Sequence, residues 1–179
     1  MTKIAPSLQT ASGHLISLLD PDPAMIEIAD IASVLSRICR YAGHTRFPYS
    51  VAEHSVLITR WLQAQGCSVE VQKQGLLHDA PEYLVGDNAR PLKELIGPPM
   101  KQVETRIWNA VCSKFGLFTI MFPEVKEADN RILFDEKAVV FKHDVDWGWS
   151  LPALGVEINF WSAEVAEFEF MNEFNRLFG

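Results

Sequence analysis

Apolar residues recur every three or four positions along most of this chain, which places them on one face of an α-helix. The first such block runs from Asp30, the expected N-cap, to Arg40. Further blocks with the same spacing cover residues 50–65, 68–78, 100–115, 123–140 and 162–178. They do not alternate with strands of period two, so the pattern predicts an all-α fold whose helices cross at varied angles.

Capping residues set several of the expected helix ends. Ser50 begins a capping-box sequence that includes Glu53 three residues later, so we expect a helix to begin there and to end near Gln65. Ser162 is the expected N-cap of the last helix. The face of that helix expected to pack inward consists of Val165, Phe168, Met171, Phe174 and Phe178.

Residues 147–161 are rich in aromatic side chains, contain Gly and Pro, and have no helical spacing. This stretch could form a short hairpin or an irregular cover over the core, and the sequence leaves both open. No repeat, low-complexity tract or linker-like stretch interrupts the chain. We therefore expect a single domain over residues 1–179, with a short irregular or hairpin insertion near the C-terminus.

The composition is that of an ordinary globular protein. With 179 residues, 48% hydrophobic and 22% charged, the chain is long enough for one domain with a sizeable core. No apolar run approaches the roughly 18 residues of a membrane-spanning helix, and residues 1–7 lack the apolar core of a secretory signal. Cys39, Cys67 and Cys112 are widely spaced, as is typical of thiols in a reducing compartment. These features predict a cytoplasmic protein that does not bind membranes.

The net charge narrows the choice of partners. A formal charge of −7 argues against a protein that binds duplex nucleic acid, because such proteins normally present a basic face. It does not argue against a small phosphate ester, which needs only a few local cations and a metal ion. A nucleotide substrate therefore remains open.

The adjacent pair His78 and Asp79 is the strongest indication of chemistry. It lies in an apolar segment, where buried polar groups must find partners. A divalent cation is one such partner, because it accepts a nitrogen and an oxygen ligand from neighbouring residues. Further ligands should then lie on other helices that face the same core.

Two residues at inward helical positions meet this requirement. His54 is three residues after Val51 on the apolar face of its expected helix, and Asp129 is four residues after Val125 on another. A single inward histidine is more often a hydrogen-bonded core residue, and a single aspartate could cap a helix or pair with a neighbouring cation. Two histidines and two aspartates from three helices, however, form a mixed set of nitrogen and oxygen ligands that suits a divalent metal.

The order of these residues resembles the H…HD…D pattern of the HD-domain metal-dependent phosphohydrolases. The wider strings resemble the branch that holds the bacterial 5'-deoxynucleotidases and the phage deoxynucleoside triphosphohydrolases, including dATP-specific ones. The resemblance covers about residues 30–140. The strings are SVAEHS at 50–55, LHDAPE at 77–82, GD at 86–87, PLK at 91–93 and VKEAD at 125–129.

The resemblance implies an HD-domain helical fold, one divalent metal ion and hydrolysis of a phosphate ester. The metal would be Mn, Co, Fe, Ni, Mg or Zn, and ligand type alone does not decide among them. The implied metal ligands are His54, His78, Asp79 and Asp129. A homo-oligomer, a dimer or larger, is also implied.

The resemblance assigns roles to six further residues. Glu82 matches the acid that polarises the attacking water, although a solvated acid at a helix end is the alternative. Asp87 matches a supporting acid, although it could simply form a turn. The residues that match substrate contacts are Arg40, Tyr41, Lys93 and Lys126.

The expected activity is hydrolysis of the 5'-phosphoester of a deoxynucleotide, with release of nucleoside and either phosphate or triphosphate. His78 lies 24 positions after His54, a shorter spacing than in the best-known deoxynucleotidases, so base specificity does not transfer. Two alternatives stay open. One is a phosphodiesterase that acts on cyclic or signalling nucleotides, and the other is a non-catalytic sensor module stabilised by a metal.

Overall fold

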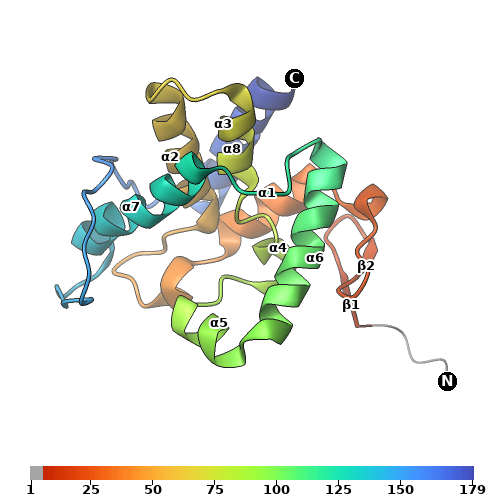
Figure 1. Cartoon of the computed structure of the whole chain (residues 1–179), viewed down its shortest axis with the longest axis horizontal. Helices are drawn as coiled ribbons and strands as arrows, with labels where there is room; N and C mark the ends of the chain where they lie inside the picture. The colour runs from red at the N-terminus through yellow and green to blue at the C-terminus, as the bar shows by residue number, and fades with distance from the viewer. Residues whose placement is uncertain (1–5) are drawn as a thin grey trace.

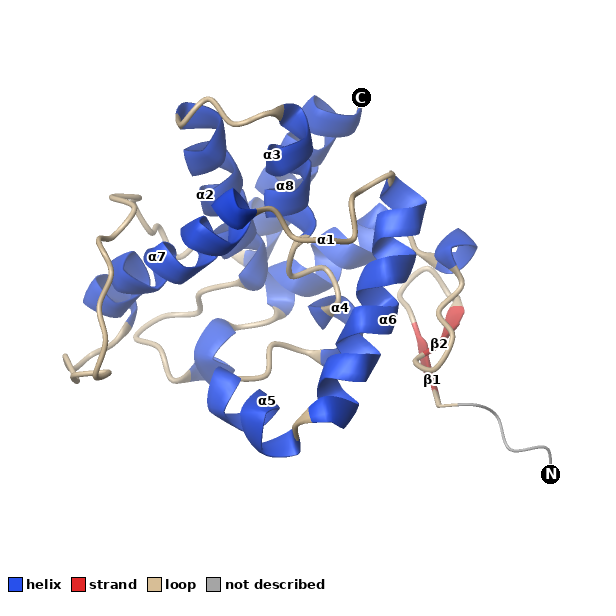
Figure 2. Cartoon of the chain, in the orientation of Figure 1, coloured by secondary structure: helices blue, strands red, loops and turns tan. Residues whose placement is uncertain are grey.

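The computed structural model describes residues 6–179 of the chain and is mostly helical. Figures 1 and 2 show the arrangement. The helices are α1 (Ile28–Arg37), α2 (Val51–Ala64), α3 (Val69–Leu77), α4 (Glu82–Val85), α5 (Arg90–Ile96), α6 (Pro98–Phe115), α7 (Pro123–Val140) and α8 (Ala163–Phe178). Two short 3-10 helices, η1 (Pro23–Met25) and η2 (Arg40–Gly43), and a hairpin of β1 (Ser7–Gln9) with β2 (Leu15–Ser17) complete the elements. The expectation of an all-α fold is thus confirmed at the level of fold class, apart from this small hairpin.

Helix α2 is the centre of the molecule. It packs against α1, α3, α7 and α8, which lie beside it and below it in Figure 1. Its apolar side chains belong to two hydrophobic clusters, one shared with α1, α6 and α8 and the other with α3, α7 and the segment 154–160. Because it is covered on several sides, nine consecutive residues from Val51 to Thr59 are buried.

Most of the expected helix ends are confirmed. The Ser50 hydroxyl accepts a hydrogen bond from the Glu53 backbone N–H at 3.1 Å, and the Ser162 hydroxyl accepts one from Val165 at 3.4 Å. The first helix is the exception, since it begins at Ile28 and ends at Arg37. Asp30 lies inside its first turn, where its carboxylate accepts from the Ser12 backbone N–H at 2.9 Å. A tertiary contact, not a cap, therefore uses this side chain.

The expected inward face of α8 was partly wrong. Val165 is 44% exposed and Phe168 is 62% exposed. Met171, Phe174 and Phe178 are half-buried and do pack against the core. The fully buried positions are Ala166, Phe170, Glu173 and Leu177. The buried stripe is rotated because α1, α2 and α3 cover a different face of α8, and there Glu173 forms ion pairs with Arg60 and Arg176.

The segment expected to be a hairpin or an irregular cover is irregular. Within residues 142–162, all of which the structure describes, no strand forms. The hairpin lies instead near the N-terminus, where Leu8 pairs with Ile16. Strands of three residues are too short to give a readable period-two pattern. The expectation about a signal sequence falls partly on residues 1–5, which lie outside the described residues.

Two buried carboxylates hold the irregular segment against the helices. Asp135 on α7 accepts from the backbone N–H groups of residues 154–156 at 2.7–3.1 Å. Glu53 on α2 accepts from those of residues 159–161, also at 2.7–3.1 Å. The predicted capping box is therefore only half formed, because the Glu53 carboxylate binds this distant segment and not the N–H of Ser50.

Two other features bear on expectations from sequence. Cys39, Cys67 and Cys112 are all free thiols. None of the described helices is long and apolar enough to cross a membrane.

We expect Glu53→Ala to destabilise the protein by about 1–3 kcal/mol, because the backbone N–H groups of residues 159–161 lose their acceptor. Urea unfolding followed by circular dichroism measures this. Glu157→Ala, at an exposed position in the same segment, is the control and should change stability by less than about 0.5 kcal/mol. Equal effects of the two substitutions would contradict the anchoring role of Glu53.

Candidate metal centre

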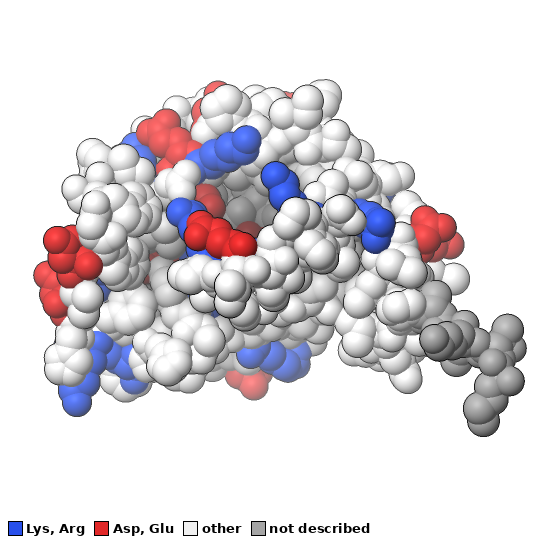
Figure 3. Space-filling model, turned by 60° about the horizontal axis from the view of Figure 1, so that its bottom comes forward, with Lys and Arg blue, Asp and Glu red and all other residues white. Residues whose placement is uncertain are grey.

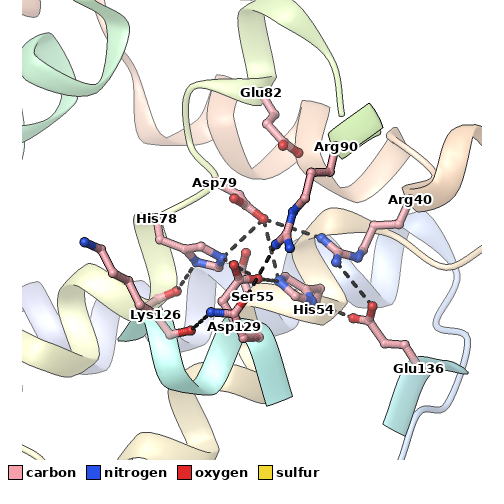
Figure 4. A network of polar contacts seen from close by, with 12 residues as sticks. Arg40, His54, Ser55, His78, Asp79, Glu82, Arg90, Lys126, Asp129 and Glu136 are labelled. Carbon is pink, nitrogen blue, oxygen red and sulfur yellow. Dashed lines mark hydrogen bonds and ion pairs between the residues drawn. The ribbon is translucent and has the colours of Figure 1, made fainter. Parts of the chain in front are cut away.

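The four residues expected to bind a metal lie together in the structure (Figure 4). His54 comes from α2, His78 and Asp79 follow the end of α3, and Asp129 comes from α7. The Nε2 atom of His54 lies 3.2 Å from Oδ1 of Asp129, and Nε2 of His78 lies 3.2 Å from Oδ2 of Asp79. The two histidine Nε2 atoms therefore face a common centre between the three elements.

The donor atoms fit a divalent cation. The Nε2 atoms of His54 and His78 are buried and make no hydrogen bond to any described residue, a state that is costly without a partner. One ligand atom from each histidine and one from Asp129 lie within 4.8 Å of one another. Imidazole nitrogen with carboxylate oxygen is a donor set that suits transition metals. Asp79 completes the group, with its Oδ2 3.6 Å from Nε2 of His54.

Hydrogen bonds on the other ring nitrogens orient both histidines. Nδ1 of His78 lies 2.8 Å from the carbonyl oxygen of Gly75, and Nδ1 of His54 lies 2.6 Å from Oε1 of Glu136. Both partners are acceptors, so in the neutral rings Nδ1 carries the hydrogen and the Nε2 lone pair points to the centre. Metal-binding histidines are typically held in this way.

The histidines and aspartates of the centre stabilise the ionised forms of one another. Burial lowers the pKa of His78, but Asp79 and Asp129 together raise it well above its ordinary value. Burial raises the pKa of Asp79, but His78 and His54 bring it down to about 2. Burial likewise acts against the ionised form of Asp129, yet the nearby His54 and His78 hold its pKa well below the usual range. Both aspartates are therefore anionic at neutral pH, as metal ligands must be.

Glu82 is a buried acid and not a solvated one. It lines a cleft of about 260 Å³ together with His78, Asp79 and Lys93, and its Oε2 atom has no hydrogen-bond partner among the described residues. Burial, followed by the charges of Asp79 and Asp87, raises the pKa of Glu82 well above its usual value. Asp87 itself is half-exposed. The structure therefore brings Glu82 to the cleft beside the centre and gives Asp87 an electrostatic influence on it.

Arg40 and Tyr41 lie at the centre, but their polar groups are already engaged. The buried Arg40 guanidinium pairs with Glu136 at 3.2 Å and with Asp79 at 3.5 Å. The Tyr41 hydroxyl donates to Glu136, and its backbone adopts a positive φ of 57°. Apart from the buried Nε of Arg40, which has no hydrogen-bond partner among the described residues, neither side chain has a polar group left for a phosphate in this arrangement.

The two lysines differ. Lys93 lies between two glutamates, with its Nζ atom 3.3 Å from Glu82 and 2.9 Å from Glu104. Lys126 is exposed beside His78 (Figure 4), and its ammonium has no carboxylate partner among the described residues. Lys126 is therefore the freer of the two to meet an anion.

Three functional neighbours were missed from sequence. Glu136 lies seven residues after Asp129, two turns further along the same helix face, and that spacing could have identified it. Arg90 lies one turn before Lys93 on α5 and lines the groove next to the cleft. Its only side-chain partner among the described residues is the neutral Asn130, at 3.3 Å. For Glu104 on α6, no motif or spacing in the sequence indicated a place near the centre.

A larger groove runs between α5 and α6 and adjoins the cleft. Its volume is about 1050 Å³, and it shares Lys93, Glu104 and Thr105 with the cleft. On the side where α5 comes forward, Figure 3 shows a hollow with basic and acidic side chains around it. The charged side chains of the groove are Arg90, Lys93, Lys101, Arg106, Glu94 and Glu104.

Comparison with known proteins gives relatives without an assigned activity. No family model matches the chain. An uncharacterized protein of Rhodobacter capsulatus is 40% identical over 121 residues, which is 65% of this chain and 62% of that protein. The uncharacterized protein YfdR of Escherichia coli K12 is 40% identical over 112 residues, 63% of this chain and 60% of that protein. The chain thus spans about three fifths of each relative, and the function must be argued from the site.

We expect the protein to bind one divalent ion per chain, and Asp129→Ala to weaken that binding by more than about 100-fold, because losing a direct ligand costs more than the 10–100-fold typical of its supporting residues. Titration calorimetry of metal-free protein with MnCl₂ measures this. Asp144→Ala, at an exposed position, removes the same charge away from the centre and should leave the affinity unchanged. Retained affinity in Asp129→Ala would contradict this assignment.

Proposed function

We propose that this protein is an HD-domain metal-dependent phosphohydrolase that cleaves the 5'-phosphoester of deoxynucleotides. The observation that supports this most strongly is the position of Glu82. A buried carboxylate with an unpartnered oxygen lines a cleft together with His78 and Asp79, two of the proposed ligands. A site that bound metal only for stability would not require such a carboxylate.

The proposed roles follow from the environment of each side chain. His54, His78, Asp79 and Asp129 hold one divalent ion, which when bound lowers the pKa of a coordinated water and offsets charge on phosphoryl oxygens. Glu82 accepts a proton in the cleft, and burial raises its pKa, which increases its proton affinity as a general base requires. Asp87 supports this role by raising the proton affinity of Glu82. The cytoplasmic location and a homo-oligomer, a dimer or larger, stay predictions.

The cations support a phosphate substrate. Arg40 and Lys93 are each paired with two carboxylates, so their charge orients side chains of the protein. Arg90 has only a neutral amide partner and Lys126 has no side-chain partner among the described residues. These two are the cations we expect to meet a phosphate group.

The test is product analysis. Purified protein with Mn²⁺ is incubated with each of the four deoxynucleoside monophosphates and each of the four triphosphates, and the products are separated by chromatography. Nucleoside with phosphate, or nucleoside with intact triphosphate, supports the proposal and distinguishes the two reactions. No turnover of any of the eight, by protein that binds Mn²⁺, would refute it and favour a sensor module or another phosphodiester substrate.

We expect Glu82→Gln to lower kcat by about 10²–10⁴-fold, because the amide cannot accept the proton. Metal affinity, measured by calorimetry, should stay unchanged, since Glu82 is not one of the proposed ligands. Glu157→Gln, at an exposed position outside the cleft, is the matched control. Full activity of Glu82→Gln would exclude Glu82 as the base.

The groove between α5 and α6 favours the longer phosphate chain. Lys101 and Arg106 line it and have no carboxylate partner among the described residues. They concentrate unpaired positive charge beside the cleft in a chain whose net charge is −7. A phosphate chain that extends from the metal centre past Lys93 would meet them.

We therefore expect the double substitution Lys101→Ala with Arg106→Ala to raise KM for the hydrolysed triphosphate by about tenfold, equivalent to about 1.4 kcal/mol. KM for any hydrolysed monophosphate should change less than twofold. The control is Lys73→Ala with Lys114→Ala, which removes the same charge outside the groove. An equal rise in KM for both pairs would indicate a general charge effect and not a site.

A further inference from the structure

Glu136 is a buried carboxylate that has no role in the proposed reaction. It is fully buried in α7, where an ionised group is stable only with several partners. Nδ1 of His54 and the Tyr49 hydroxyl contact its Oε1 atom at 2.6 and 3.0 Å. Arg40 Nη2, at 3.2 Å, and the Tyr41 hydroxyl contact Oε2. Each oxygen thus has two donors, which fills the hydrogen-bonding capacity of a carboxylate.

Glu136 determines which ring nitrogen of His54 carries the hydrogen. The Arg40 guanidinium and the hydroxyls of Tyr41 and Tyr49 all donate to Glu136, so its carboxylate acts as an acceptor of hydrogen bonds. When His54 is neutral, its hydrogen must therefore be on Nδ1. The Nε2 lone pair is then free and points toward Asp129, 3.2 Å away.

Glu136 is also linked through Arg40 to Asp79, a second proposed metal ligand. The guanidinium is planar and rigid, with Nη2 3.2 Å from Glu136 and Nη1 3.5 Å from Asp79. The carboxylate of Glu136 therefore fixes the plane in which Arg40 faces Asp79. One side chain thereby acts on both His54 and Asp79, which come from different elements.

We propose that Glu136 is the positioning residue of the metal centre: it selects the Nδ1–H tautomer of His54 and, through Arg40, places Asp79. The inference rests on the metal centre of the proposed function but not on the reaction, since its tests use no substrate. A glutamine at this position has the same size but can turn its amide N–H toward Nδ1. That would favour hydrogen on Nε2, and in this form the Nε2 atom that faces the centre cannot bind a metal.

The first experiment compares Glu136→Gln with Asp135→Asn. Asp135 is the adjacent buried carboxylate on α7, but it contacts the backbone of residues 154–156 and not the centre. Metal-free proteins, shown to be folded by circular dichroism, are titrated with MnCl₂ in a calorimeter. We expect Glu136→Gln to bind about 10–100-fold more weakly than the wild type, as is typical when a supporting carboxylate is lost. Asp135→Asn should bind as the wild type does.

The second experiment needs no variant. Nitrogen-15 NMR of metal-free wild-type protein, at a pH where His54 is neutral, should show hydrogen on Nδ1 and none on Nε2. Hydrogen on Nε2 would overturn the proposal whether or not Glu136→Gln folds. In folded Glu136→Gln, we expect a mixture of tautomers.

The remaining outcomes separate the two proposals. Unchanged Mn²⁺ affinity in Glu136→Gln, or equal losses in both variants, would overturn the positioning role and leave the proposed function standing. Wild-type protein that binds neither Mn²⁺ nor Co²⁺ would overturn the proposed function and, with it, the metal-positioning role. Weaker binding confined to Glu136→Gln, with the expected wild-type tautomer, supports the inference.

Discussion

Burial of the polar first turn of α2 is the constraint on which the rest of this structure depends. Glu53, His54 and Ser55 are consecutive, polar and fully buried in a helix that is covered by four others. Buried polar groups need partners, and the turn itself cannot supply them. Glu53 therefore accepts from residues 159–161, and His54 pairs with Glu136, 82 positions away in the sequence. Meeting these requirements brings distant segments of the chain to one place.

Helix α7 supplies several of the hydrogen-bond partners that these buried polar groups need, because it carries acidic residues. Asp129 and Glu136 lie two turns apart and both contact His54, one on each ring nitrogen. Asp135, one residue earlier than Glu136, points elsewhere and holds residues 154–156. The same helix therefore completes the candidate metal centre and fixes the irregular segment that covers the second hydrophobic cluster. Helix α7 thus contributes both to the stability of the fold and to the candidate metal centre.

The cations near the centre fall into two groups with different physical roles. Arg40 and Lys93 each lie between two carboxylates, so they neutralise and orient acids that would otherwise repel one another. Arg90, Lys101 and Arg106 line the groove without a carboxylate partner among the described residues. Part of the unpaired positive charge of this acidic protein therefore lies beside the cleft. This separation is consistent with an anionic substrate and does not require a basic surface overall.

The sequence by itself predicted α1, α2, α3, α6, α7 and α8, but not the short helices α4 and α5, and it identified the four residues of the candidate centre. Caps such as Ser50 and Ser162 act within one turn, and helical spacing alone indicated that His54 and Asp129 face inward, so local physics was sufficient. The family resemblance added Glu82, which the structure brings to the cleft beside them.

Only the tertiary structure decided which partners these side chains meet. Helical spacing did not reveal that Phe168 is exposed, because neighbouring helices decide which face of α8 is covered. Nor did the sequence show that Arg40 is held by Glu136, 96 positions away, because such contacts depend on packing and not on local hydrogen bonds. Periodicity specifies the face of a helix on which a residue lies, whereas packing specifies what that face contacts.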